Sequence, residues 1–206
     1  MANVITSGRF ILASASPRRI ELLSLLGLRF EVMPSHVNES FMKGEMPREH
    51  VLRLSEEKTE KATAAHPDAW VMGADTIVII SGEVLGKPRT SDEAKEMLGK
   101  LSGRVHTVFT GFTVTRKSTD ILIRDAVESS VRFREIPDDE MAWYIGSEEP
   151  YDKAGGYAVQ GMGAFFVKEI HGSYTNVMGL PLCEVVDVLK GVGAIDFTGG
   201  YHGFNR

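Results

Sequence analysis

Cysteine is nearly absent from this sequence, and so are several features that define large protein classes. The 206 residues include one cysteine, Cys183, which excludes an internal disulfide and a cysteine-rich metal site and fits a reducing compartment. No apolar run approaches the ~20 residues that a membrane-spanning helix needs. The opening MANVITSGRF lacks the basic-then-apolar layout of a secretory signal. We therefore expect a soluble cytoplasmic protein with no membrane partner.

An excess of positive charge is also absent, because the formal net charge is −5 at pH 7. Aromatic residues are not interleaved with basic ones, so nucleic acid is not an expected partner. The sequence has no GxxxxGK(S/T), no GxGxxG after a strand, no GxSxG and no HExxH, and its histidines are scattered. These absences argue against P-loop, Rossmann and serine-hydrolase enzymes and leave hydrolysis by metal and water.

What the sequence does contain is a regular alternation of apolar and polar segments. With 43% hydrophobic residues the chain can bury a full core, as one large domain or two lobes. The pattern predicts strands at 10–13, 28–34, 70–80, 104–117, 121–136 and 164–172, and helices at 17–27, 47–65, 90–101, 137–149 and 180–193. Strands and helices alternate first and a long hairpin follows, which indicates a mixed α/β sheet. We expect residues 1–195 to form one domain and 196–206 a flexible tail.

The segment ILASASPRRIELLSLLG (11–27) poses an electrostatic problem. Ser16 is placed to cap the predicted helix and Pro17 suits its first position, but Arg18 and Arg19 then occupy the first turn. The positive end of the helix dipole disfavours cations there. Either both arginines point into solvent, or they join the free backbone N–H groups in an anion site suited to phosphate.

Asp75 lies inside the apolar run WVMGADTIVII (70–80), where an unpaired carboxylate is costly to desolvate. Such a residue is paired in a structural salt bridge, bound to metal, or catalytic. A regular strand directs Asp75 and Thr76 to opposite faces. If both serve one pocket, the strand must end or bulge there, and Gly73 would permit that.

Three further charged residues allow both a functional and an ordinary interpretation. Lys58 shares a helix face with Leu54 and Ala62, so its ammonium either snorkels to the surface or points into a cleft. Lys87 sits on a rigid Gly-Lys-Pro turn, where a lysine is often simply solvated. Glu39, in a polar loop, is either a metal ligand or a surface acid.

Five blocks of the sequence resemble, in order, the Maf family of nucleotide pyrophosphatases. They are LASASPRR (12–19), GADTIV (73–78), GKP (86–88), DKAGGYAVQG (152–161) and GSYTNVMGLPL (172–182). Together they span almost the whole chain, which makes the resemblance specific. It implies an α/β fold like that of the inosine-triphosphate pyrophosphatases, with a mixed sheet flanked by helices and two lobes around a central cleft.

The resemblance also implies an activity: hydrolysis of a nucleoside triphosphate to the monophosphate and pyrophosphate, with a divalent cation such as Mg²⁺ or Mn²⁺. Asp75 corresponds to the proton acceptor of the family. The positions linked to substrate specificity are Arg18, Thr76 and Gln160. Other polar cleft positions are Ser14, Arg19, Glu39, Lys58 and Lys87, with Glu39 a metal ligand and Asp75 a second one. Where the family commonly has an acidic residue before Glu39, this sequence has Asn38.

Gln160 bears on the base, because its amide offers one donor and one acceptor. Uracil and thymine present an O4 acceptor beside an N3–H donor, which this amide can pair with. The DKAGGYAVQG block resembles the dTTP/UTP-hydrolysing branch of the family, with modified pyrimidines as further candidate substrates. A methylated or deaminated purine nucleotide is one alternative. A second is a nucleotide-binding inhibitor of cell division, which would not need a buried base such as Asp75. A homodimer is expected from family habit and from the strand edges of 104–136.

Overall fold

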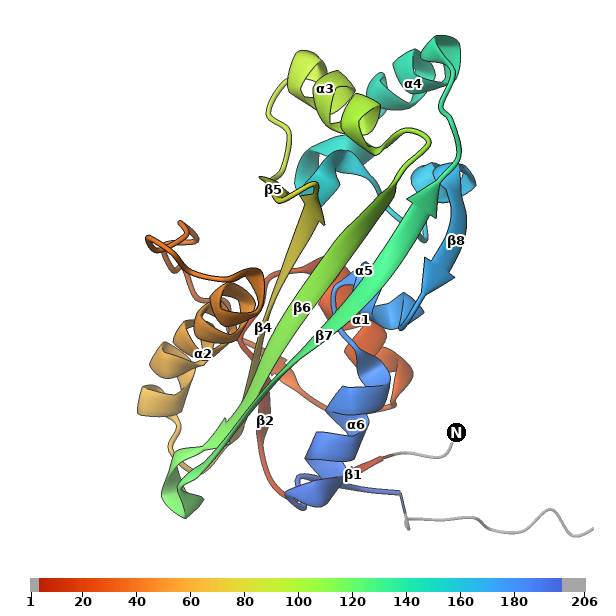
Figure 1. Cartoon of the computed structure of the whole chain (residues 1–206). Helices are drawn as coiled ribbons and strands as arrows, with labels where there is room; N and C mark the ends of the chain where they lie inside the picture. The colour runs from red at the N-terminus through yellow and green to blue at the C-terminus, as the bar shows by residue number, and fades with distance from the viewer. Residues whose placement is uncertain (1–3, 198–206) are drawn as a thin grey trace, which may run out of the picture. The chain divides into compact units, whose positions relative to one another are not determined.

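The computed structural model describes residues 4–197, and the chain folds into two compact units. The first comprises the residues up to Asp75, Gly111–Asp125, and those from Leu180 on; the second comprises Thr76–Thr110 and Ala126–Gly179. Three long strands pass from one unit into the other and run side by side in Figure 1: β4 (Trp70–Ile80), β6 (Val105–Arg116) and β7 (Ile121–Phe133). They belong to a seven-stranded sheet in the order β3-β2-β4-β6-β7-β8, with β5 paired to β4.

In the first unit the parallel pairing of β2 with β4 places the polar turn after β2 beside the middle of β4. Its elements are β1 (Ile5–Thr6), β2 (Phe10–Leu12), α1 (Pro17–Leu25), β3 (Glu31–Val32), α2 (Pro47–Ala65), the 3₁₀ turn η1 (Lys117–Thr119), α6 (Leu182–Gly191) and β9 (Ile195–Asp196). β2 pairs in parallel with β4, with Leu12 opposite Met72. The pairing continues past Leu12, where the backbone N–H of Ala13 donates to the carbonyl of Met72 (2.7 Å). The turn after β2 therefore lies beside the part of β4 that carries Asp75.

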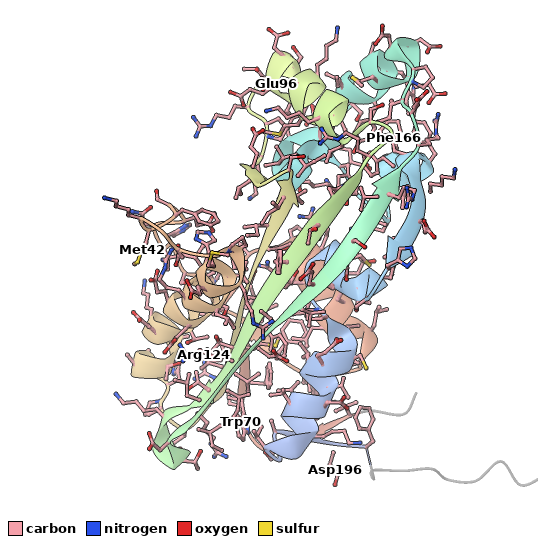
Figure 2. The ribbon with its side chains drawn as sticks, in the orientation of Figure 1. Met42, Trp70, Glu96, Arg124, Phe166 and Asp196 are labelled. Atoms are coloured by element: carbon pink, nitrogen blue, oxygen red, sulfur yellow. The ribbon has the colours of Figure 1, made fainter. Side chains whose placement is uncertain are left out.

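Helix α2 packs unusually close to β4 because of a glycine. A Cβ at Gly73 would lie 2.3 Å from the backbone oxygen of Ser55 and 2.9 Å from Cγ2 of Thr59. Any side chain at position 73 would push the helix away from the strand. The close approach brings the buried face of α2, including Lys58, against the strand two residues before Asp75. Arg124, labelled in Figure 2, ties β7 to the same helix through Glu56 (Nη1–Oε2, 2.6 Å).

The second unit has an aromatic core. Its own elements are β5 (Glu83–Leu85), α3 (Ser91–Leu101), α4 (Asp138–Ile145), η2 (Glu149–Asp152), η3 (Ala154–Gly156), η4 (Met162–Phe166), β8 (Val167–His171) and α5 (Tyr174–Met178). Phe133 packs edge-on against Tyr157 and His106, with ring centroids 4.7 and 5.0 Å apart. Phe166, labelled in Figure 2, packs edge-on against Tyr144 of α4. These side chains are almost fully buried.

Most predicted elements are present, and the differences are local. α2 and β4 have the predicted bounds, and Thr90 caps α3 by accepting from the backbone N–H of Glu93 (3.2 Å). α1 ends at Leu25 and α4 at Ile145, earlier than predicted, while 164–166 form a 3₁₀ turn instead of strand. The predicted tail begins inside β9, which pairs with β1, and 198–206 lie outside the described residues. Across residues 4–197 no helix has both the length and the apolar character to cross a bilayer.

His106 of β6 makes the stability of the second unit pH-dependent. Burial lowers its pKa from 6.5 to about 4. Its Nε2 contacts the hydroxyl of Tyr157 at 2.8 Å, while its Nδ1 has no hydrogen-bond partner among the residues placed by the structure. The unfolded chain binds a proton at this histidine below pH 6.5, but the folded chain does not until about pH 4. The contribution of neutral His106 to the free energy of unfolding is therefore complete above pH 6.5. As the pH falls toward 4, about 3 kcal/mol of it is lost.

We expect His106→Leu to remove this part of the pH dependence. Urea unfolding of the native protein and the variant at pH 7.5 and pH 4.5 measures this effect. For each protein the free energy of unfolding at pH 4.5 is subtracted from that at pH 7.5, and the difference between the two results isolates His106. The decrease on acidification should be smaller in the variant by about 2–3 kcal/mol. Equal decreases in the two proteins would contradict the assignment.

Candidate active site

The turn after β2 is organised around the hydroxyl of Ser14. Its Oγ accepts from the backbone N–H of Ser16 (3.3 Å) and from Nη1 of Arg19 (3.2 Å). Ser16 occupies the N-cap position as predicted, but its side chain makes no capping bond, so that part of the prediction is wrong; Pro17 stands at the start of the helix as expected. The hydroxyl two residues earlier orders the turn in its place.

Arg19 does not point into solvent, because its side chain is only 8% exposed. Burial lowers the pKa of its guanidinium and nearby Arg18 lowers it further, while the negative charges of Asp75 and Glu39 raise it. Burial is the largest of these influences, so the surroundings as a whole disfavour the charged form. A bound polyanion would favour that form instead, which would resolve the conflict with the helix dipole.

Lys58 joins two carboxylates from different elements. Its Nζ lies 2.6 Å from Oδ1 of Asp75 on β4 and 2.7 Å from Oε1 of Glu39 in the loop before α2. Lys58 and Asp75 are 8% and 6% exposed, so the lysine does not snorkel to the surface. Asp75 is thus paired, as its burial requires. Its partner Lys58 has a flexible side chain, and its ammonium group could also bind a substrate phosphate. The pair is therefore compatible with an active site as well as with a structural ion pair.

The loop carrying Glu39 is fastened to α2 by contacts that the sequence did not suggest. Asn38 Oδ1 accepts from the backbone N–H of Ser40 (3.0 Å), and Arg53 Nη2 donates to the Ser40 carbonyl (3.1 Å). Arg53 also binds both oxygens of Glu45 and holds the pKa of that carboxyl at about 2. Asn38 therefore shapes this loop. The spacing of residues along α2 could not predict the pairing of Arg53 with Glu45, because Arg53 lies on the helix and Glu45 in the loop before it.

β4 runs unbroken through Gly73, Asp75 and Thr76. The strand predicted over 70–80 is therefore confirmed. It neither ends nor bulges at Gly73, the condition for Asp75 and Thr76 to serve one pocket, and this glycine serves the approach of α2 instead. The Oγ1 of Thr76 lies 2.9 Å from Oγ1 of Thr110 and 3.4 Å from the carbonyl of Gly179. Thr76 thus contacts Gly179 of the GSYTNVMGLPL block, whereas Asp75 contacts Lys58 of α2.

Lys87 and Gln160 lie on exposed turns of the second unit. The backbone N–H of Gly155 donates to the carbonyl of Gly86 (3.0 Å), which joins the GKP turn to the DKAGG segment. Gly155 has φ +74°, and a Cβ there would lie 3.1 Å from Cγ1 of Val78. Both its backbone conformation and its surroundings require glycine. This contact places the GKP and DKAGG segments side by side in the second unit.

The predicted site residues divide between the two units, and hydrogen bonds and ion pairs connect several of those in the first unit. The first unit gathers Ser14, Arg18, Arg19, Glu39, Lys58 and Asp75, and the second contains Thr76, Lys87 and Gln160. Among residues 4–197 no group of three or more His, Cys, Asp or Glu side chains could hold a metal ion. The carboxylates that contact Lys58, those of Glu39 and Asp75, are the candidate metal ligands in this cluster. Hard carboxylate oxygens fit Mg²⁺ when substrate phosphates complete its coordination.

Comparison with known proteins agrees with the fold and with the stretch of chain that the sequence blocks span. The Staphylococcus aureus Ham1 protein has a similar fold, with a TM-score of 0.51 at 13% identity over 90% of this chain and 100% of that one. A family model described as Maf-like protein matches residues 9–192. A dTTP/UTP pyrophosphatase of Syntrophus aciditrophicus is 60% identical over 94% of this chain and 95% of its own length, and one of Geotalea uraniireducens is 51% identical over 90% and 96%.

The fold and the turn after β2 define an α/β protein with two arginines, one of them buried, in the first turn of the helix that follows a strand. More specifically, this chain belongs to the Maf family. The resemblance seen in its five sequence blocks is thereby confirmed, as is the predicted mixed α/β fold class.

Proposed function

We propose that this chain is a nucleoside triphosphate pyrophosphatase that converts dTTP and UTP to their monophosphates and pyrophosphate. The observation that carries the proposal is the buried Lys58–Asp75 pair beside the buried Arg19. It combines a carboxylate able to accept a proton with cations that favour a polyphosphate. The names of the relatives, dTTP/UTP pyrophosphatases at 60% and 51% identity, support the same reaction.

The cations would bind the triphosphate. A nucleoside triphosphate carries about four negative charges, and guanidinium groups bind phosphate through paired N–H donors. We assign Arg18 and Arg19 with the Ser14 hydroxyl to the phosphates, with Lys58 and Lys87 as further positive charges. Burial lowers the pKa of Arg19. A phosphate beside it would favour its charged form, so binding and charge support each other.

Asp75 would act as the proton acceptor. Its carboxylate takes a proton from a water molecule as the water oxygen forms a bond to the α-phosphorus. The bond between the α-phosphorus and the oxygen bridging to the β-phosphorus breaks, and pyrophosphate leaves with that bonding pair. The lysines and arginines stabilise the charge that develops on it. Lys58 fixes the orientation of the Asp75 carboxylate through the 2.6 Å contact.

A divalent cation, Mg²⁺ or Mn²⁺, is part of the proposal. Glu39 and Asp75 would hold it, since both are carboxylates and both contact the same ammonium group. Such an ion supplies positive charge to phosphate oxygens. Gln160 would read the base, because an amide pairs with the O4 acceptor and N3–H donor of uracil or thymine.

Product analysis with a panel of nucleoside triphosphates tests the proposal. With Mg²⁺ present, we expect dTTP and UTP to give monophosphate and pyrophosphate while purine triphosphates stay largely intact. Faster hydrolysis of purine triphosphates would be consistent with the proposed reaction but would contradict the role of Gln160 in recognising the base. Release of orthophosphate instead of pyrophosphate would overturn the reaction itself.

Lys58→Met should destabilise the protein strongly. Removing one partner of a buried ion pair leaves an uncompensated charge, which typically costs about 3–5 kcal/mol. Combining it with Asp75→Asn should restore part of that stability, because the buried carboxylate is then gone as well. Urea unfolding of the two single variants and the double variant measures the coupling.

Lys100 provides a matched control for Lys58. It also pairs with two carboxylates, Glu83 and Glu96, but its side chain is more exposed and its partners lie at the surface. Lys100→Met should leave the free energy of unfolding nearly unchanged. Equal losses for Lys58→Met and Lys100→Met would contradict the view that burial makes the Lys58 pair costly to break.

A further inference from the structure

One carboxylate, that of Glu149, binds the backbone immediately after Gln160. Its Oε2 accepts from the N–H of Met162 and its Oε1 from the N–H of Gly163, each at 2.8 Å. Tyr144 also donates its hydroxyl to Oε1 at 2.9 Å. Hydrogen bonds to an ionised acceptor are roughly twice as strong as neutral ones. The start of η4 is thus held by a side chain from η2, thirteen residues earlier in the chain.

The glycine between Gln160 and this carboxylate has a spatial purpose. A Cβ at Gly161 would lie 2.1 Å from Oε2 of Glu149 and 2.6 Å from its Cδ. The backbone angle of Gly161, φ −111°, is one that any residue adopts. Position 161 therefore requires glycine because of the carboxylate and not because of the backbone. The position of Glu149 thus explains why a glycine follows Gln160 in the sequence.

Glu149 is itself well anchored. Its backbone N–H donates to Oγ of Ser147 (3.3 Å), and its carbonyl accepts from Nζ of Lys153 (2.9 Å). Its partner Tyr144 is fully buried, and the ring packs edge-on against Phe166 with centroids 5.0 Å apart. Burial and the bond to Glu149 raise the pKa of the Tyr144 hydroxyl, which keeps it protonated as a donor. The clamp formed by Glu149 on Met162 and Gly163 therefore connects the aromatic core to the turn.

Gln160 itself lies on a turn that is only weakly closed. The residue is exposed, and a long backbone contact of 3.4 Å from the Gly161 N–H to the Ala158 carbonyl closes its turn. Reading a base through two hydrogen bonds needs the amide within about 0.5 Å and 10–20° of the productive geometry. An exposed turn reaches that precision only if its ends are fixed. The Glu149 carboxylate fixes the C-terminal end.

We propose that Glu149 is a positioning residue for Gln160 and thereby sets selectivity for the base, an inference that rests on the proposed pyrimidine nucleotide hydrolysis. Glu149 does not touch the base. It acts by holding Met162 and Gly163, so that Gln160 presents its amide in one orientation. Losing the clamp should affect recognition of the base and not the bond-breaking step.

Glu149→Gln tests this proposal with a side chain of the same shape. The new amide places an NH₂ group against one of the two backbone N–H donors, so one contact becomes repulsive. We expect the ratio of kcat/KM for dTTP to that for GTP to fall about 10-fold, through KM for dTTP, with kcat within about 3-fold of the original. The neighbouring Glu148→Gln is the matched control, because Glu148 is exposed and makes none of these contacts; its ratio should be unchanged.

A second background separates positioning from general damage. In a Gln160→Ala protein, Glu149→Gln should change the dTTP-to-GTP ratio less than about 2-fold, because there is no amide left to orient. An equal fall in both backgrounds would overturn the proposal. So would an unchanged ratio in a folded Glu149→Gln protein.

Gly161→Ala keeps the test decisive if Glu149→Gln does not fold. The added methyl displaces the carboxylate while the backbone stays in an allowed conformation, so the same fall in the ratio is expected. A folded Gly161→Ala protein with the original ratio would overturn the proposal. If the wild-type protein itself does not hydrolyse dTTP, the proposed function fails, which is a different outcome from an unchanged selectivity ratio.

Discussion

Asp75→Asn is expected to lower kcat for dTTP by roughly 10²–10⁴-fold, the usual contribution of a general base. An amide cannot take up the proton that the attacking water must lose. Its oxygen still accepts from Lys58 Nζ, which lies 2.6 Å from Oδ1 in the native protein. The phosphate-binding residues should therefore stay in place, and the dissociation constant for dTTP measured without a divalent cation should change less than about 3-fold.

Two measurements make this result specific. Calorimetric binding of dTTP to the inactive variant shows whether the site is intact. Asp125→Asn is the matched control, because Asp125 also pairs with a cation, Arg48, but both side chains are about half exposed (44% and 55%). That variant should keep full activity. An Asp75→Asn protein with near-wild-type turnover would show that Asp75 has only a structural role.

Gln160→Glu is expected to lower kcat/KM for dTTP on the order of 10²-fold and to reduce discrimination against GTP. A carboxylate only accepts hydrogen bonds, so it faces the O4 acceptor of thymine with repulsion. Guanine presents two donors, N1–H and N2–H₂, which a carboxylate can accept. Steady-state kinetics with dTTP, UTP and GTP measure the change.

Gln160→Ala separates the two causes of that loss. It removes the hydrogen bonds without adding a repulsive group, so its loss on dTTP should be near 10-fold, smaller than for Gln160→Glu. Equal losses for the two variants would indicate that position 160 acts through space filling. Unchanged dTTP-to-GTP ratios in both would place base recognition elsewhere.

The long periodic elements could be predicted from sequence because their patterns are strong over many residues. α2 and β4 have the predicted bounds, and the burial of Asp75 followed from the apolar run around it. Lys58 broke the apolar face of its helix, which indicated either a surface or an inward orientation. The choice between them depends on Gly73, whose missing side chain lets the helix approach the strand.

Side-chain contacts made by loops and short turns escaped prediction. The pairing of Arg53 with Glu45 and the clamp of Glu149 on Met162 and Gly163 join loops and short turns that carry no periodicity. Helix α5 is only five residues long, too short for a helical pattern to be recognised. The Gly-rich composition of 152–163 did mark this region, but composition does not indicate which side chain binds the backbone of the turn.

Hydrolysis of dTTP in water enriched in ¹⁸O tests the central claim most directly. If a water molecule attacks the α-phosphorus under the action of Asp75, the label appears in dTMP and the pyrophosphate stays unlabelled. Label in the pyrophosphate would mean attack at the β-phosphorus. Label in orthophosphate would mean cleavage of the terminal phosphate. Either of these results would contradict the proposed reaction.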